Sequence, residues 1–204
     1  MSGMILSWIS ISISMMALWR AAEYDRFAWL WICVGSLLGI AIYLPIGLYG
    51  HVFLDVIYLI FAFYGYQLWA IFPIRVMNRF QRSYLLVSII VASICTVQIL
   101  ELCSSTDAWV DALNLVTGCA GLALMVLSFL EQWVVWIIHD AMTLVLNIRA
   151  GLWLLAVKKM IYLIFAFRGY IRWLDKYEQN ACATPLLSEA GQASSRLLAD
   201  IFID

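Results

Sequence analysis

The sequence contains few charged residues and few prolines for its length. Of its 204 residues, 12% are charged and three are proline, while 65% are hydrophobic and the mean hydropathy is +0.94. One soluble domain of this size cannot hide so much apolar surface from water. These shortages exclude an ordinary soluble enzyme or binding domain and predict an integral membrane protein surrounded by a lipid bilayer.

Several functional signatures are also absent. The five cysteines form no Cys-x-x-Cys pair, which argues against a disulfide framework and against a structural zinc site. With two histidines and no evident third ligand, we expect no metal and no other cofactor. The net charge of −1 provides no basic surface for nucleic acid, and the sequence has no glycine-rich phosphate loop.

Seven long apolar stretches are present. They cover residues 4–20, 27–45, 48–72, 84–101, 108–129, 132–148 and 151–173. Because a transmembrane helix needs about 20 mostly apolar residues, the sequence predicts an all-α protein with seven transmembrane helices. The first stretch follows no basic residues and precedes no small-residue cleavage site, so we expect a retained helix and not a secretion signal.

An internal repeat divides these stretches into two groups. Residues 57–69 (IYLIFAFYGYQLW) and 161–173 (IYLIFAFRGYIRW) are identical at ten of thirteen positions, with a constant offset of 104. We therefore predict two three-helix repeats, 4–72 and 108–173, joined by a linker helix at 84–101. The matching helices are four apart in the chain, so both repeats run in the same direction. Membrane proteins built from repeats commonly hold a substrate at the repeat interface, which makes transport the leading hypothesis.

Basic residues near the predicted helix ends indicate the orientation. One side of the membrane receives Arg20, Arg26, Arg75, Arg79, Arg82, Arg172 and Lys176, whereas the opposite loops hold only Arg149. An excess of lysine and arginine marks the cytoplasmic face, so we expect the N-terminus outside and the C-terminus inside. Residues 1–173 then form the transmembrane domain, and the polar residues 174–204 are expected to be a solvated cytoplasmic tail.

A narrow polar and aromatic stripe runs along the predicted helix at 132–148. At about 100° per residue, its members fall within an arc of about 80°: Trp133, Trp136, Asp140, Thr143 and Asn147. A carboxylate at mid-membrane depth costs about 2.5–3.5 kcal/mol on insertion scales, so this stripe should face the bundle interior or a water-filled cavity. We favour a substrate pocket over an interfacial belt of tryptophans with a structural Asp140.

The two repeat helices carry charged and aromatic residues at matching positions. Asp55 corresponds to Lys159 under the 104-residue offset, and Tyr58 corresponds to Tyr162. Two lone charges of opposite sign at equal depth in hydrocarbon become less costly when they pair. We therefore predict an ion pair between Asp55 and Lys159 with either a structural or a gating role, and we expect both tyrosines to face the cavity.

Two further polar residues complete the predicted cavity. Asp111 and Asn114 lie on another narrow helical arc, which we expect to form part of its wall. A carboxylate beside tryptophan faces suits a cationic ring such as a pyridinium or a thiazolium. An intramembrane enzyme is disfavoured, because the neighbours His139 and Asp140 point about 100° apart on their helix.

Three elements of the sequence resemble the PnuC family of bacterial vitamin transporters. They are WVDALN at 109–114, EQWVVWIIHD at 131–140, and the paired G-Y-x-x-W helix ends at 65–69 and 169–173. The resemblance runs from about Phe27 to Trp173. It implies a SWEET-like fold of three helices, one linker helix and three helices in the bacterial inner membrane. Members of the family pass nicotinamide riboside, thiamine or riboflavin, generally by facilitated diffusion with phosphorylation inside the cell trapping the substrate.

The resemblance also assigns individual residues. Trp133 and Trp136 match the aromatic pair that lines the family's pocket, and Asp140 stands where nicotinamide riboside transporters typically have Asn. Asp55 replaces a neutral amide, and Arg168 replaces a smaller polar residue. The resemblance implies nicotinamide riboside uptake, and we expect the first three helices to rock against the last three so that the site faces each side in turn. A thiamine transporter, a proton-coupled vitamin transporter and a non-transporting sensor remain alternatives, and a homo-oligomer remains an alternative to a monomer.

Overall fold

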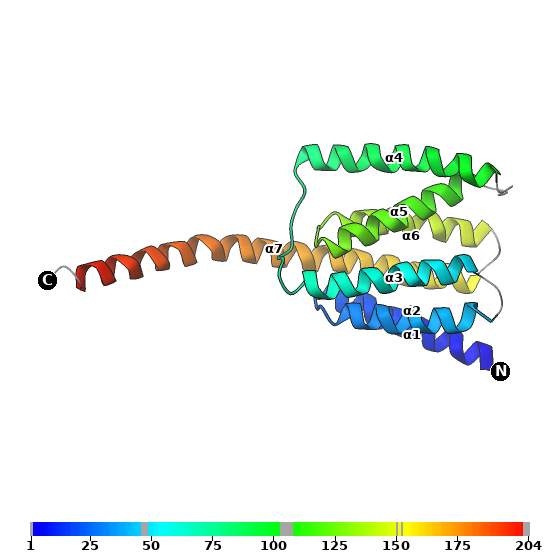
Figure 1. Ribbon diagram of the computed structural model, residues 1–204, viewed down its shortest axis with the longest axis horizontal. Coiled ribbons are helices and arrows are strands. Elements are labelled where there is room, and N and C mark those ends of the chain that lie inside the picture. Colours follow the sequence, from blue (N-terminus) through cyan, green and yellow to red (C-terminus); the bar gives the residue numbers. More distant parts are fainter. Residues whose placement is uncertain (1, 46–48, 103–107, 150, 152, 202–204) are drawn as a thin grey trace.

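The computed structural model describes residues 2–45, 49–102, 108–149, 151 and 153–201, which form seven α-helices and no strand. The helices are α1 (Ser2–Ala22), α2 (Ala28–Tyr43), α3 (Tyr49–Leu68), α4 (Arg79–Leu102), α5 (Ala108–Val126), α6 (Gln132–Arg149) and α7 (Trp153–Ile201). The predicted all-α fold is confirmed, and the helices follow the seven predicted stretches closely. The exception is α7, which continues as one helix through most of the predicted tail (Figure 1).

Two helices in the described part of the chain have the length and composition of membrane spans. Arg79–Ile99 and Ala108–Val126 are long and apolar enough to cross a membrane, with mean hydropathies of 1.7 and 1.6. Ala28–Ile42 and Asp55–Leu68 are shorter apolar helices. A helix suits such a sequence because it satisfies its own backbone hydrogen bonds where no water is present.

Six of the helices close into a ring. α2 lies between α1 and α3, and α6 lies between α5 and α7. The ring is completed where α1 packs against α7 and where α3 packs against α5. α4 packs against α5 alone and stands outside the ring, and α7 projects far beyond it (Figure 1).

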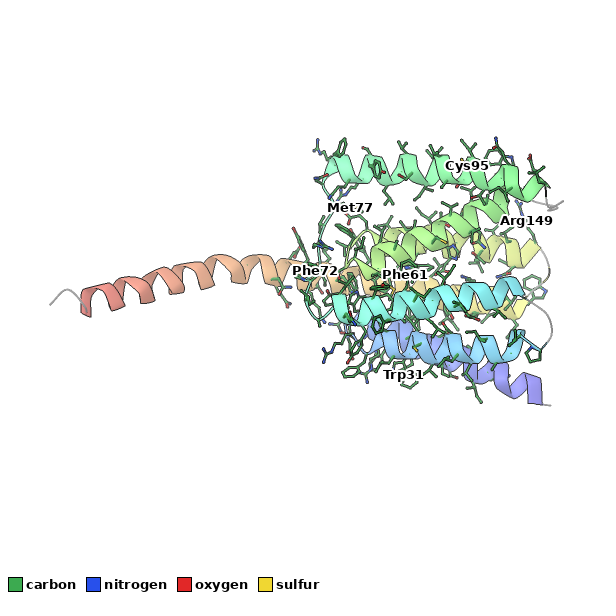
Figure 2. The ribbon with its side chains drawn as sticks, viewed as in Figure 1. Trp31, Phe61, Phe72, Met77, Cys95 and Arg149 are labelled. Atoms are coloured by element: carbon green, nitrogen blue, oxygen red, sulfur yellow. The ribbon has the colours of Figure 1, made fainter. Side chains whose placement is uncertain are left out.

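The loops that join α1 to α2, α3 to α4 and α5 to α6 gather at the end of the ring from which α7 projects (Figure 1). We call it the tail end. Phe72 and Met77 lie there, and Arg149 lies at the opposite end (Figure 2). Two of these loops are bonded to each other, because Arg75 N donates to Ser128 O and Leu130 N donates to Arg75 O, both at 2.9 Å.

One helix contact occurs twice in the ring. A β-carbon on Gly65 of α3 would lie 2.2 Å from Trp29 Cε2 of α2, and one on Gly169 of α7 would lie 2.5 Å from Trp133 Cη2 of α6. Both tryptophans are fully buried, and only glycine lets the helix backbones approach them so closely. The two contacts are related by the same 104-residue offset that relates the repeat helices.

Candidate functional site

All six ring helices line one cavity with a volume of about 340 Å³. Its polar and aromatic lining residues are Ser10, Ser14, Trp31, Ser36, Asp55, Tyr58, Trp133, Trp136, His139, Asp140, Lys158, Lys159 and Tyr162. α4 contributes no residue to this lining. The predicted pocket tryptophans, both predicted tyrosines and both members of the predicted ion pair thus line one cavity.

Three other predicted site residues, Thr143, Asn114 and Asn147, are not part of the cavity lining. Thr143 Oγ1 donates a hydrogen bond to Asn114 Oδ1 at 2.8 Å and ties α6 to α5. Neither of these residues lines the cavity, and Asn147 does not line it either. Asp111 lies on α5, and its side chain is outside the part of the chain that the structure describes.

Asp140 and Lys159 form an ion pair inside the cavity. Lys159 Nζ lies 2.6 Å from Asp140 Oδ1, and the two side chains are 18% and 6% exposed. The lysine also lies over the ring of Tyr162, with its Nζ 5.5 Å from the ring centroid. A charge-assisted bond of this length is strong, and here it is largely removed from competing solvent.

Lys159 thus bonds Asp140, a partner that the repeat offset does not indicate. The offset predicts Asp55 as the partner of Lys159, and that pairing stays a prediction. Asp55 faces α2, where a β-carbon on Gly39 would lie 2.1 Å from Asp55 Oδ2. Each of the two charged residues thus points toward the middle helix of its own half.

The two predicted pocket tryptophans differ in their surroundings. Trp136 packs on α5, where a β-carbon on Gly121 would lie 2.9 Å from its Cε2, and it contacts the His139 ring edge-on at 5.4 Å. Trp133 is 1% exposed and contacts Trp173 edge-on at 5.7 Å. Trp136 is thus a partly exposed residue of the cavity lining, whereas Trp133 is a buried one.

Sequence reasoning missed several lining residues. Ser36 is buried and stands at the position that corresponds to Asp140 under the 104-residue offset, which is the signal that could have identified it. Lys158 and His139 also line the cavity, and His139 Nδ1 lies 3.2 Å from Thr117 Oγ1. Among the described side chains, no group of three His, Cys, Asp or Glu residues could hold a metal ion.

A cluster of aromatic residues, the aromatic plug, fills the ring near the tail end. Its members are Tyr24, Trp29, Trp69, Trp133 and Trp173. Tyr24 stacks on Trp69 at 4.8 Å and meets Trp173 edge-on at 4.9 Å, while Trp69 and Trp173 are 5.4 Å apart. The Tyr24 hydroxyl donates to Phe72 O, and burial raises the pKa of this hydroxyl, so it keeps its proton.

The indole groups of the plug bond across the ring. Trp69 Nε1 donates to Met125 O, and Trp173 Nε1 donates to Ala21 O, both at 2.8 Å. Both donors and both acceptors are separated by 104 residues, so the two bonds correspond. Each bond joins α1–α3 to α5–α7, and the plug therefore closes the ring at this end.

A cluster of charged residues lies beside the plug. Glu23, in the loop after α1, accepts a hydrogen bond from Arg168 Nη2 at 2.8 Å and lies 3.7 Å from Arg172 Nε. Lys176 Nζ donates to the Glu23 carbonyl oxygen. The bond from Arg168 and the nearby positive charges hold the pKa of Glu23 below its usual value. Helical spacing does not pair Arg168 or Arg172 with Glu23, because Glu23 is distant in the chain.

Comparisons with known proteins identify the fold and the family of this chain. No curated protein matches the sequence. A solved structure described as the crystal structure of the vitamin B3 transporter PnuC shares the fold, with a TM-score of 0.72 and 18% identity over 85% of this chain and 82% of that chain. The family model for nicotinamide mononucleotide transporters matches residues 4–175, nearly the whole ring. The chain therefore belongs to the nicotinamide mononucleotide transporter (PnuC) family, which is a family of membrane transporters and not of enzymes.

Proposed function

We propose that this protein takes up nicotinamide riboside by facilitated diffusion with alternating access. The observation that carries the proposal is the cavity of about 340 Å³ inside the ring, because it places Asp140 among aromatic rings in a transporter family. A cavity of this size suits a small molecule. The faces of Trp136 and Tyr162 attract a cation, and Asp140 supplies the counter-charge for a pyridinium ring.

The proposed binding residues fall into two groups. Trp136, Asp140, Tyr58 and Tyr162 contact the cargo, with Trp133 beneath it. Thr143, Asn147 and Asn114 support the cavity wall from α5 and α6, and Asp111 stays a proposed binding residue on α5. Asp55 balances the charge of the cavity from α3.

We further propose that the ring consists of two parallel three-helix repeats, with α4 as the linker, as in a SWEET-like transporter. The 104-residue offset relates helix contacts, indole hydrogen bonds and lining residues on the two sides, which supports this division. The protein would lie in the bacterial inner membrane with its N-terminus outside. The basic residues Arg75, Arg79 and Arg82 near the tail end favour a cytoplasmic position for that end.

Alternating access then requires the aromatic plug to open. The contacts of Trp173 with Tyr24 and Trp69, and the two indole hydrogen bonds, all join one repeat to the other. Rocking of α1–α3 against α5–α7 would break them together and open the cavity toward the tail end. The plug is thus the inner gate of the proposed cycle.

Uptake into proteoliposomes tests this function. We expect labelled nicotinamide riboside to equilibrate across the membrane and to stop at equal concentrations, with or without a pH gradient. Accumulation above equilibrium under the gradient would establish the proton-coupled alternative instead. Ligand binding without any flux would identify a sensor.

Thiamine is the second candidate cargo, because its thiazolium ring would use the same acid and the same aromatic faces. A thermal-shift comparison of nicotinamide riboside, thiamine and riboflavin separates the candidates. Stabilisation by riboflavin alone would contradict the assignment of a cationic cargo.

A further inference from the structure

Lys159 contacts the groups of the cavity that would bind a cation. Its ammonium group is bonded to Asp140 at 2.6 Å and lies 5.5 Å from the Tyr162 ring centroid, so it engages a carboxylate and an aromatic face at once. These are the two groups that a cationic ring would use. The side chain is 18% exposed and lines the cavity, so it is close enough to compete with cargo there.

The partner of this ammonium group is poorly exposed. Asp140 is 6% exposed at its side chain, and Lys159 is the cation that bonds it. Inside a membrane protein, a carboxylate with a bonded cation is far less costly than one without. A cargo cation can reach the carboxylate only if Lys159 gives it up.

We propose that Lys159 is a tethered competitor of the cargo cation and sets the preference of the cavity between cationic and neutral molecules. The inference rests on the proposed function, since it concerns the same cavity. A cationic cargo binds Asp140 by displacing the lysine, and the lysine returns to Asp140 when the cargo leaves. Lys159 therefore limits affinity and promotes release, which a facilitated transporter needs in order to turn over.

The adjacent Lys158 provides a matched control. It also lines the cavity, and its Nζ lies 5.3 Å from the same Tyr162 ring. Asp140, however, is hydrogen-bonded by Lys159 and not by Lys158. Removing Lys158 subtracts one positive charge from the same cavity without releasing Asp140, and so separates competition from a general charge effect.

Two ligands of nearly equal shape give the readout. Nicotinamide riboside carries a cationic ring, and its dihydro form carries a neutral one. Dissociation constants for both are measured by calorimetry on the purified full chain, in wild type, Lys159→Met, Lys159→Gln and Lys158→Met. Lys159→Gln is included because the glutamine amide can still donate a hydrogen bond to Asp140. This variant should therefore fold even if Lys159→Met does not.

We expect both Lys159 variants to bind the cation at least about tenfold more tightly relative to the neutral form than wild type does, since one charge-assisted bond no longer has to break. Uptake of the cation should show a lower KM together with a lower maximal rate. Lys158→Met should shift the ratio by less than about threefold, because screening weakens an unbonded charge.

Two results would overturn the inference: an unchanged ratio of the two dissociation constants, or a shift in Lys158→Met as large as in the Lys159 variants. An unchanged ratio in which both ligands are weakened equally would make the ion pair structural. Failure of the proposed function looks different, since wild type itself would then bind neither ligand.

Discussion

The hydroxyl groups of Tyr24 and Ser128 are hydrogen-bonded at 2.9 Å across 104 residues of chain. The same two residues have positive φ values, 52° and 60°, and no other described residue except glycine does. Each stands two positions after the end of its helix, α1 or α5. A left-handed residue at this point ends a helix and turns the chain sharply. The two halves of the molecule thus turn at equivalent places and are bonded to each other there.

Removing the hydroxyl of Tyr24 should loosen the aromatic plug. Tyr24→Phe keeps the ring contacts but loses the hydrogen bonds to Phe72 O and Ser128, and we expect the free energy of unfolding to fall by about 1–2 kcal/mol. The initial uptake rate should rise if opening of the plug limits transport. Thermal unfolding and uptake measure the two effects. Tyr64→Phe, on an exposed side chain of α3, is the control and should change neither.

Trp136 should contribute strongly to cargo binding. We expect Trp136→Ala to raise the dissociation constant at least about tenfold, because it removes an aromatic face beside Asp140. Titration of the purified protein with the preferred vitamin measures this. Trp109→Ala removes an indole that is 55% exposed on α5, outside the cavity lining, and should leave the affinity unchanged. Equal effects of the two substitutions would contradict the pocket assignment.

Gly169 should not tolerate a larger residue. In Gly169→Ala the new methyl group would lie 2.5 Å from Trp133, and the helices must separate to relieve the overlap. We expect a loss of about 1–3 kcal/mol, as for overpacking in a protein core, visible as a lower unfolding temperature. Gly35→Ala is the matched control, because its methyl group would meet Ile13 at an ordinary 3.5 Å. A loss in Gly35→Ala of the same size would show that any added methyl group is harmful.

The Glu23 cluster should stabilise the protein in a pH-dependent manner. The pKa of Glu23 is lowered in the folded state, chiefly by the bond from Arg168, so its contribution is present above the usual glutamate pKa and is lost as the pH falls through the folded value. Wild type should therefore unfold at a higher temperature than Glu23→Gln at neutral pH, and the difference should vanish in acid. High salt should also reduce it. A difference that persists in acid would assign the effect to packing.

The sequence by itself determined the number of helices, their approximate bounds and the candidates for the cavity lining. Helix formation in lipid depends on local apolar composition, and the stripe on 132–148 depends on spacing within one helix, so no knowledge of neighbours is needed. The 104-residue offset between the repeat helices likewise related Tyr58 to Tyr162, and both tyrosines line the cavity. Composition predicted the structure less well beyond residue 173, where a stretch rich in polar and small residues continues α7 as a helix.

Only the tertiary structure decided which side chains meet. Asp140 bonds Lys159 because α6 lies beside α7, and Glu23 meets Arg168 because the loop after α1 lies beside the same helix. The aromatic plug likewise draws its members from α2, α6, α7 and the loops that follow α1 and α3. Such contacts depend on the order of helices around the ring. Periodicity within a helix shows which face is polar, but it carries no information about which helix lies opposite that face.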